Sequence, residues 1–419
     1  MKSASAVLGA ASRELPLRLA VAKWVGYFAL IDLLFLPYFQ GIIIPYGLPV
    51  LLLVGAIVGL KIEQDRYLFA FLFLSLAVVA SFVLSVFLLN SDTWMVENFK
   101  RVIQMLSSFL YFFYFRWIAK KAELDITPII VVFAFWFVGL GVSFVISPVE
   151  TGELIRSIYG RLATDEDTLA EHLRFAYVFT DPNTGAYFFL IAASFILVSS
   201  NLSTQRLIAL FFLLATGTLF TQSRGALIAL VLVFLVTLIR PGGETRLPRL
   251  RSIVVFAVVL AAALVPVYQS FSDLLEEYRA LSLSFLRLFE SQESYVRGGN
   301  RFEIWWGVVN NLLPLPLGRG YSLSIGGALY APHSDFLRMF YSYGFLALIP
   351  MLYFLFGRFL AWPPLIIPSL MAFLTNTLID EQKLFSLFLV LLAILVAKRG
   401  TGCVRGGIRR FRQGEAKRP

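Results

Sequence analysis

A single arginine separates two apolar runs at residues 219–229, FTQSRGALIAL. The sequence LIALFFLLATGTLFTQ precedes Ser223-Arg224-Gly225 and overlaps that window, and ALIALVLVFLVTLI follows it. A permanent charge between two lengths of chain that favour hydrocarbon is costly unless a group at that point requires a cation. The arginine is therefore the first candidate for chemistry in this sequence.

The residues around Arg224 predict an anion site. Ser223 is a good helix N-cap, so the following helix should begin at Arg224. An arginine in the first turn opposes the helix dipole. A bound anion reverses that effect, because the free N–H groups, the positive helix end and the guanidinium would all face it, and Gly225 would leave room for a phosphate. The structural alternative is an arginine that extends to the outer lipid headgroups.

Further polar residues interrupt other apolar segments. Asp181 can cap a helix whose first residue is Pro182, and this structural role needs no function. Arg174 lies seven residues before Asp181 and would share a face with it if the segment were helical throughout. Asp32, midway along the first apolar run, is a functional candidate whose partner the sequence does not identify. The acidic run at 165–167 has no companion histidine cluster, so neither a metal site nor a cofactor is predicted.

The composition shows what surrounds these residues. Of 419 residues, 58% are hydrophobic and 15% are charged, whereas soluble domains carry about 25% charged residues. The apolar runs predict an all-α polytopic membrane protein with about twelve transmembrane helices, since a bilayer core requires about 20 helical residues. The chain is predicted to form one membrane domain, 1–419, with spans at 19–39, 41–60, 67–89, 102–118, 127–148, 174–199, 206–221, 224–239, 252–270, 335–356, 361–378 and 383–398.

The basic residues predict the orientation of these helices. With the N-terminus inside, most of the 36 lysines and arginines fall in the inner connections and in a basic tail at 399–419. Basic residues are retained on the cytoplasmic side, so both termini are predicted to be cytoplasmic. The net charge of +10 then reflects attraction to the lipids of an anionic inner leaflet, and no nucleic-acid partner is predicted.

The cations left on the outer side are mostly arginines. Positioning a helix in a membrane has no preference for guanidinium, whereas bidentate phosphate recognition does. Pairing with loop carboxylates is the structural alternative for any one of them. Together they predict a polyanionic ligand at the outer face, and they are Arg101, Arg156, Arg161, Arg174, Arg224, Arg279, Arg287, Arg297, Arg301, Arg319 and Arg338, with Lys100 and Lys383.

The long polar connections lie on the same predicted side. Residues 149–173 form one, and 271–334 form a large periplasmic loop that is too long for a mere connector. Within it, 271–289 has apolar residues at helical spacing, which predicts an amphipathic helix on the membrane or across the mouth of the bundle. The two histidines, His172 and His333, lie in or at the edge of these loops. Two candidate general bases are therefore expected on the arginine-rich side.

Three short stretches resemble a known family. They are SRGA at 223–226, RFEIWW…P…GRGY at 301–321 and HSDFLRMFYSYGF at 333–345. These stretches, their order, the twelve or so helices and the large loop before the last three helices resemble the superfamily of O-antigen ligases and O-antigen polymerases. The resemblance spans most of the chain, although its specific motifs cover short patches.

The histidine motif is the part that resembles the ligases in particular. Their pattern of histidine, then Asn, Ser or Gln, nine residues and glycine is matched by His333, Ser334 and Gly344. The sequence departs from it at Ala347, where ligases usually have Gly, Thr or Tyr. Ile228 stands where the arginine motif has leucine. The resemblance thus favours a ligase and leaves a polymerase open.

The resemblance implies a metal-independent glycosyl transfer at the periplasmic face of a bacterial inner membrane. The donor would be a glycan on undecaprenyl diphosphate, and the acceptor either a lipid A–core sugar, for a ligase, or another lipid-linked repeat, for an O-antigen or exopolysaccharide polymerase. Arg224 and Arg301 would hold the diphosphate, and His333 would activate or orient the acceptor hydroxyl. With the outer-face residues above, the predicted substrate-binding set is Ser223, Gly225, Arg174, Asp181, Arg297, Arg319 and Arg338.

A transporter of lipid-linked anionic glycans is the alternative from another class, since it would also need intramembrane arginine. Transporters tend to have repeated, interrupted helices at the membrane midplane. The sequence has no convincing internal repeat, and its polar residues gather at one membrane face. It therefore favours an enzyme.

Overall fold

The computed structural model is a bundle of α-helices. It describes residues 2–36, 45–89, 92–159, 174–179, 181–200, 202–239, 316–318, 320, 334–357 and 361–400. Its helices are α1 (Lys2–Phe35), α2 (Gly47–Val58), α3 (Arg66–Leu89), α4 (Asp92–Lys121), α5 (Thr127–Ile146), α6 (Pro148–Tyr159), α8 (Pro182–Ser199), α9 (Thr204–Thr221), α10 (Arg224–Ile239), α14 (Asp335–Phe356), α15 (Pro363–Thr375) and α16 (Gln382–Gly400).

These helices confirm the prediction of an all-α polytopic membrane protein. Within the described ranges, six helices are long and apolar enough to cross a membrane, and α2, α10 and α15 are shorter apolar helices. Every predicted span except 252–270 corresponds to a described helix. That span, the predicted amphipathic helix at 271–289 and the tail beyond residue 400 lie outside the described residues.

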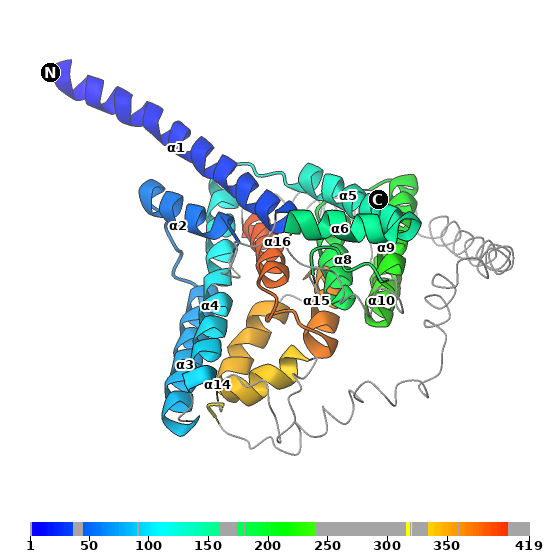
Figure 1. The fold of residues 1–419 in the computed structure, drawn as a ribbon. Helices are drawn as coiled ribbons and strands as arrows, with labels where there is room; N and C mark the ends of the chain where they lie inside the picture. The colour runs from blue at the N-terminus through cyan, green and yellow to red at the C-terminus, as the bar shows by residue number, and fades with distance from the viewer. Residues whose placement is uncertain are drawn as a thin grey trace, which may run out of the picture.

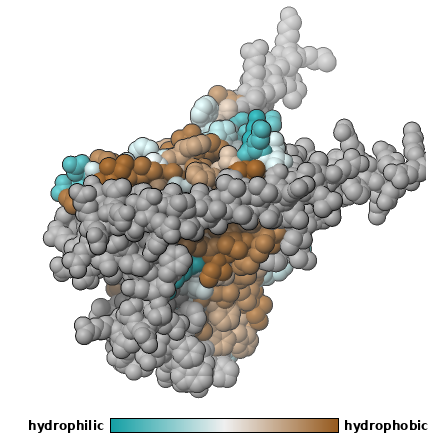
Figure 2. Space-filling model, turned by 90° about the vertical axis from the view of Figure 1, so that its right-hand side faces the viewer, coloured by the Kyte–Doolittle hydropathy of each residue, from teal (hydrophilic) through white to brown (hydrophobic). Residues whose placement is uncertain are grey.

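The outer surface of the bundle suits a membrane. Large apolar side chains are exposed on the outward faces of α3, α5 and α10, such as Phe87, Ile146 and Val231. Figure 2 shows the described surface on one side of the molecule as predominantly hydrophobic. In water such a surface would be a liability, whereas in a bilayer it contacts lipid tails. The first part of α1 extends away from the body of the bundle (Figure 1).

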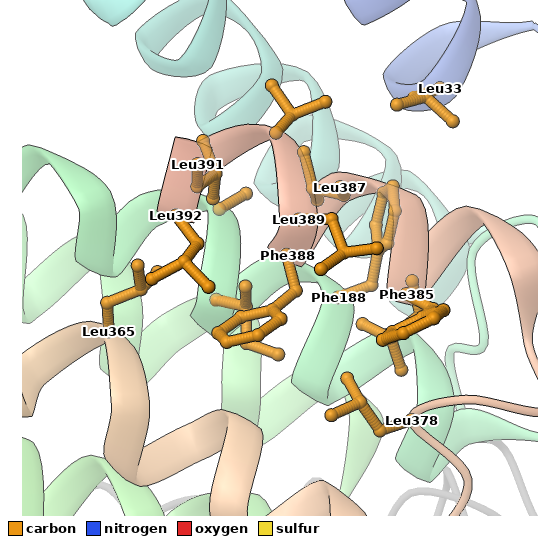
Figure 3. Close-up of a cluster of buried hydrophobic side chains, with 14 of the residues drawn as sticks. Leu33, Phe188, Leu365, Leu378, Phe385, Leu387, Phe388, Leu389, Leu391 and Leu392 are labelled. Atoms are coloured by element: carbon orange, nitrogen blue, oxygen red, sulfur yellow. The ribbon is translucent and has the colours of Figure 1, made fainter. Parts of the chain in front are cut away.

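Helix α16 lies in the middle of the bundle. Its residues 382–395 are buried, and it packs against α4, α8 and α1. Figure 3 shows Phe385 and Phe388 of α16 among Leu33, Phe188 and Leu378 from other parts of the chain. A helix that is apolar all round must be enclosed by protein or lipid. Because α16 is enclosed by other helices, it holds the polar segment 376–381 that leads into it at a fixed place.

Two predicted boundaries were wrong. The polar loop expected at 149–173 is helical over 149–159, in α6. Pro148 suits the first position of a helix, and the negative charge of Glu150 stabilises the positive helix N-terminus. The span expected at 174–199 begins at Pro182, because Asp181 caps α8 and the residue before a proline avoids helical geometry.

Helix α14 is broken at Gly344, the glycine of the histidine motif. Its φ of +74° and ψ of 179° belong to a region that is essentially restricted to glycine. In a continuous helix the Leu346 N–H would bond to the Ser342 carbonyl. Here the Leu346 N–H donates to Pro316 O at 3.2 Å, and Ser342 O accepts from Gly320 N at 2.8 Å. The described residues of 316–320 therefore fill the break.

Two glycines allow this close approach of two backbones. A Cβ at Gly344 would lie 2.4 Å from the Pro316 carbonyl oxygen, and one at Gly318 would lie 2.2 Å from the Ser342 carbonyl carbon. Both distances are far below van der Waals contact. The kinked α14 packs between α3 and α15 (Figure 1), so the inserted segment joins the large loop to the bundle.

We predict that Gly344→Ala destabilises the protein. Alanine would add backbone strain of about 1–3 kcal/mol and would push the segment at Pro316 out of the break. The melting temperature of the detergent-solubilised protein should fall. Gly139→Ala is the control, since Gly139 is exposed in α5 and a Cβ there meets no atom within 4 Å. Equal melting temperatures for the two variants would contradict the role given to Gly344.

Candidate active site

Polar side chains gather at one end of the bundle, where α8, α10, α14 and α16 begin and α9 and α15 end. Backbone hydrogen bonds join these termini: Phe175 N donates to Phe220 O at 3.1 Å, and Asp335 N donates to Asn376 O at 3.2 Å. We call it the arginine end, because it holds Arg101, Arg174, Arg224 and Arg338.

The turn between α9 and α10 places Arg224 at this end. Gln222 ends α9 in the left-handed region, with φ +52°. Ser223 is buried, and its Oγ accepts a hydrogen bond from Ala226 N at 3.4 Å. The predicted N-cap and the predicted start of α10 at Arg224 are thus confirmed. The Arg224 side chain is partly exposed, so it is accessible at the positive end of a helix.

Gly225 has a different role from the one expected. A Cβ at this position would lie 2.5 Å from the Tyr187 hydroxyl oxygen. The Tyr187 hydroxyl in turn lies 3.1 Å from Thr375 Oγ1. The space beside Gly225 is therefore taken by a tyrosine of α8, and the expectation that it leaves room for a phosphate was wrong. Its absent side chain lets α10 approach α8 and α15.

Arg174 and Asp181 meet through Asn183. The Arg174 guanidinium donates to Asn183 Oδ1 at 3.1 Å and, from Nε, to Thr221 O at 3.2 Å. Asp181 Oδ1 accepts from Asn183 N at 3.0 Å, which confirms it as the cap of α8. Residues 174–179 are not helical, so a shared helical face was the wrong geometry. Arg174 instead ties its own segment to α8 and the end of α9.

The segment 376–381 links the start of α8, near Arg174, with the start of α14, near Arg338. Asn376 is buried, its carbonyl accepts from Asp335 N, and its Nδ2 donates to Thr184 Oγ1 at 3.3 Å. The buried Asp335 carboxylate accepts from the backbone N–H groups of Leu378 and Ile379. The segment is therefore fastened at once to the start of α14 and to the start of α8.

Asp380 in this segment is shared by two arginines. Its carboxylate pairs with the buried Arg338 of α14. Arg101 of α4 donates from Nη1 to Asp380 O at 3.0 Å, and the same Nη1 lies 3.5 Å from Asp380 Oδ1. A pocket beside these groups is lined by Arg101, Gln104, Met105, Asp335, Arg338, Met339, Tyr343, Ile379 and Asp380. Two guanidinium groups and two carboxyl groups, those of Asp335 and Asp380, thus line this pocket.

Glu381 in the same segment has an altered titration. Burial raises the pKa of its carboxyl to about 7, although the charge and backbone N–H of Lys383 act in the opposite direction. Its Oε1 is buried and has no hydrogen-bond partner among the described residues. A carboxyl that titrates near neutral pH therefore lies next to the arginine pairs.

The buried Asp32 is held by hydrogen bonds from α2 and α16. Lys383 Nζ donates to Asp32 O at 3.1 Å and also to Leu36 O. Asp32 Oδ2 accepts from Gly47 N at 2.6 Å. This group fastens α1 to α2 and α16 beside the segment 376–381, a positioning role.

Several predicted site residues lie outside the described part of the chain: His333, Arg301, Arg297 and Arg319, and also His172. The neighbours of two of them are described. Ser334, which follows His333, caps α14 by accepting from Leu337 N at 3.4 Å. Gly320, which follows Arg319, lies so close to α3 that a Cβ there would be 2.3 Å from Ser85 Cβ.

Sequence reasoning missed Asp335, Asn376 and Asp380, and it counted Arg101 without assigning it to the site. The polar run NTLIDEQK at 376–383, between two apolar runs, was the available signal. Among the described residues, no group of three or more His, Cys, Asp or Glu side chains could hold a metal ion.

Comparison with known proteins finds a family model that matches part of the chain. Residues 209–352 match the family model described as O-antigen ligase. The matched region runs from α9 through Arg224 to the part of α14 beyond Gly344. No curated protein matches the sequence.

We predict that Asp380→Asn destabilises the arginine end. The substitution removes the counter-charge that Arg101 and the buried Arg338 share, which should lower the free energy of unfolding by about 3–5 kcal/mol. The measurement is thermal unfolding of the purified protein in detergent. Glu123→Gln removes an exposed carboxylate after α4 and should leave the melting temperature unchanged. A melting temperature for Asp380→Asn equal to that of the control would show that the shared carboxylate contributes nothing.

Proposed function

We propose that this member of the O-antigen ligase superfamily transfers a glycan from undecaprenyl diphosphate to an acceptor sugar at the periplasmic face of a bacterial inner membrane. The family match supports glycan ligation or polymerisation by a glycosyltransferase-like enzyme, and the helices are those of a multi-pass membrane protein. The observation that carries the finer proposal is Arg224, which is partly exposed in the first turn of α10 at the arginine end.

The proposed chemistry requires stabilisation of a leaving diphosphate. The bond between the anomeric carbon and the diphosphate oxygen breaks, and negative charge develops on that oxygen. A guanidinium and the N-terminus of a helix both stabilise such charge. Arg224 supplies the two together, and its planar fork can hold two phosphate oxygens. Arg301, Arg297 and Arg319 are proposed as further contacts to the diphosphate or the attached glycan.

The acceptor hydroxyl must lose a proton as the new glycosidic bond forms. His333 is proposed to accept that proton or to orient the hydroxyl, since a neutral imidazole is available near pH 7. The residue after it, Ser334, is buried and caps α14, whose first residue Asp335 is bonded to the segment 376–381. This anchoring supports a fixed position for the backbone next to the proposed base.

The remaining arginines are proposed to line the donor site. Arg338 faces the pocket beside Asp380, and the ion pair would hold its guanidinium in place. Arg174 and Asp181, joined through Asn183 in the first turn of α8, are proposed to bind the glycan next to the diphosphate, with Ser223 at the turn before Arg224. Periplasmic orientation of this end, with both termini in the cytoplasm, is supported by the basic residues of the opposite end.

Ligation to lipid A–core is the preferred reaction, and polymerisation of lipid-linked repeats is the alternative with the same donor. Lipopolysaccharide from a deletion strain distinguishes them on a gel. For a ligase, we expect loss of all O-antigen from the core while polymer of normal length stays on the lipid carrier. Core that carries a single repeat would establish the polymerase instead. Unchanged lipopolysaccharide and unchanged carrier-linked polymer would exclude both.

We predict that Arg224→Lys is inserted normally and loses activity by roughly 10–1000-fold. Lysine retains the charge but lacks the planar fork and its paired hydrogen bonds. Transfer from a purified lipid-linked donor is the measurement. Arg206→Lys is the matched control, because Arg206 is exposed in the first turn of α9 at the opposite end, and it should retain activity. Full activity in Arg224→Lys would make this arginine an anchor to lipid headgroups.

A further inference from the structure

A second pocket lies at the end of the bundle away from the arginines. It is formed between the segment 59–65, which joins α2 to α3, and the last two turns of α4. Along α4 the distance from Arg101 to this end is roughly 30 Å, at about 1.5 Å per residue. We call it the cation pocket, and it is lined by Lys61, Ile62, Glu63, Phe113, Arg116, Trp117, Lys120 and Lys121.

The cation pocket has a surplus of positive charge. Arg116 donates to Glu63 Oε2 at 2.9 Å and pairs with Asp65, while Lys120 pairs with the same oxygen of Glu63. Burial raises the pKa of Asp65, but the hydrogen bond and charge of Arg116 outweigh burial, so the pKa lies below its usual value and the carboxylate is ionised. Four cations of the pocket therefore face two carboxylates, which leaves a net positive charge.

Three cationic side chains of the cation pocket have hydrogen-bond donors that could contact a ligand. The side chains of Lys61 and Lys121 are exposed. The Arg116 side chain is nearly buried, and its Nε has no hydrogen-bond partner within the described part of the chain. A buried guanidinium N–H without an acceptor is costly. An anionic oxygen in the pocket would be attracted by the two lysines and by the guanidinium at once.

The other side of the pocket is apolar. Phe113 is buried, Trp117 is partly exposed, and Ile62 is 42% exposed. Tryptophan beside lysine and arginine is the usual composition of a helix end at the level of lipid headgroups. In α2, which leads into the pocket, Leu53 and Ile57 are exposed as well. The charged lining thus continues into surface that suits acyl chains.

We propose that the cation pocket binds the phosphodiester headgroup of an anionic glycerophospholipid, whose acyl chains lie along the exposed apolar side chains of α2. Lys61 and Lys121 attract the phosphate, and the paired Arg116 and Lys120 form the base of the site. A soluble phosphate would make no contact with the neighbouring apolar surface. A lipid would contact the charged lining with its headgroup and the apolar side chains with its acyl chains. A net positive pocket also favours an anionic headgroup over a zwitterionic one. This site is independent of the glycosyl transfer proposed above.

Native mass spectrometry of the full-length protein, titrated with phosphatidylglycerol or phosphatidylcholine in detergent, tests the proposal. We expect phosphatidylglycerol to bind at least about ten times more tightly than phosphatidylcholine. The double variant Lys61→Gln with Lys121→Gln should weaken that binding by roughly 10–30-fold, since each cation near a lipid surface contributes to attraction. The variant Lys61→Arg with Lys121→Arg, which keeps both charges, should bind as the wild type does.

A charge-matched control is Lys23→Gln with Arg206→Gln, which removes two cations outside the pocket and should leave the affinity unchanged. Both glutamine variants alter side chains that make no ion pair within the described residues, so equal melting temperatures will show that folding is intact. Three results would overturn the proposal: equal binding by the Lys61/Lys121 glutamine variant and the wild type, equal affinity for both lipids, or displacement of the lipid by excess inorganic phosphate, which would indicate a site for a free anion.

Discussion

Charge inside a membrane protein must be neutralised within the protein or by a ligand, and the arrangement of this bundle follows from that requirement. The ionic groups at the arginine end, buried or partly buried, each join different helices. Asp380 holds α4 and α14 to the segment before α16, Asp335 holds the same segment by its backbone, and Lys383 holds the end of α1. In hydrocarbon such groups cannot form hydrogen bonds to water, so they must be satisfied by other parts of the protein. These contacts hold the helix termini in place. The result is a polar end at which charged side chains join several helix termini.

The enclosed helix α16 makes this end possible. Its apolar residues on every face, among them Phe385 and Phe388, require protein contacts on every side. The charged residues just before it are therefore drawn into the interior, where they need partners from α1, α4 and α14. Arg224 differs from them, because it is partly exposed in the first turn of α10. A partly exposed cation at a helix N-terminus, beside a group of paired charges, is the arrangement on which the proposed binding of an anionic donor rests.

The features that could be predicted from the sequence are those that depend on neighbouring residues. Ser223 and Asp181 cap helices by accepting hydrogen bonds from residues at most three positions later in the chain. The apolar runs predict the helices, so the caps and the helices could both be predicted. Arg101 contacts Asp380, which is 279 residues away in the chain. No local sequence pattern predicts this contact. Gly225 shows the same limit: its position at a helix start suggested open space, whereas the structure fills that space with Tyr187 from another helix. Local roles such as helix caps were predictable, but not the pairing of polar groups that are distant in the chain.

The break in α14 has a consequence for biogenesis. A helix that enters the membrane alone must satisfy its own backbone, yet the N–H of Leu346 and the carbonyl of Ser342 are bonded to Pro316 and Gly320. Those two groups can reach their final partners only after the described residues of 316–320 have come to lie against the helix. Assembly of this region therefore includes a docking step between these residues and α14. Membrane insertion of this region and completion of its fold are separate events in time.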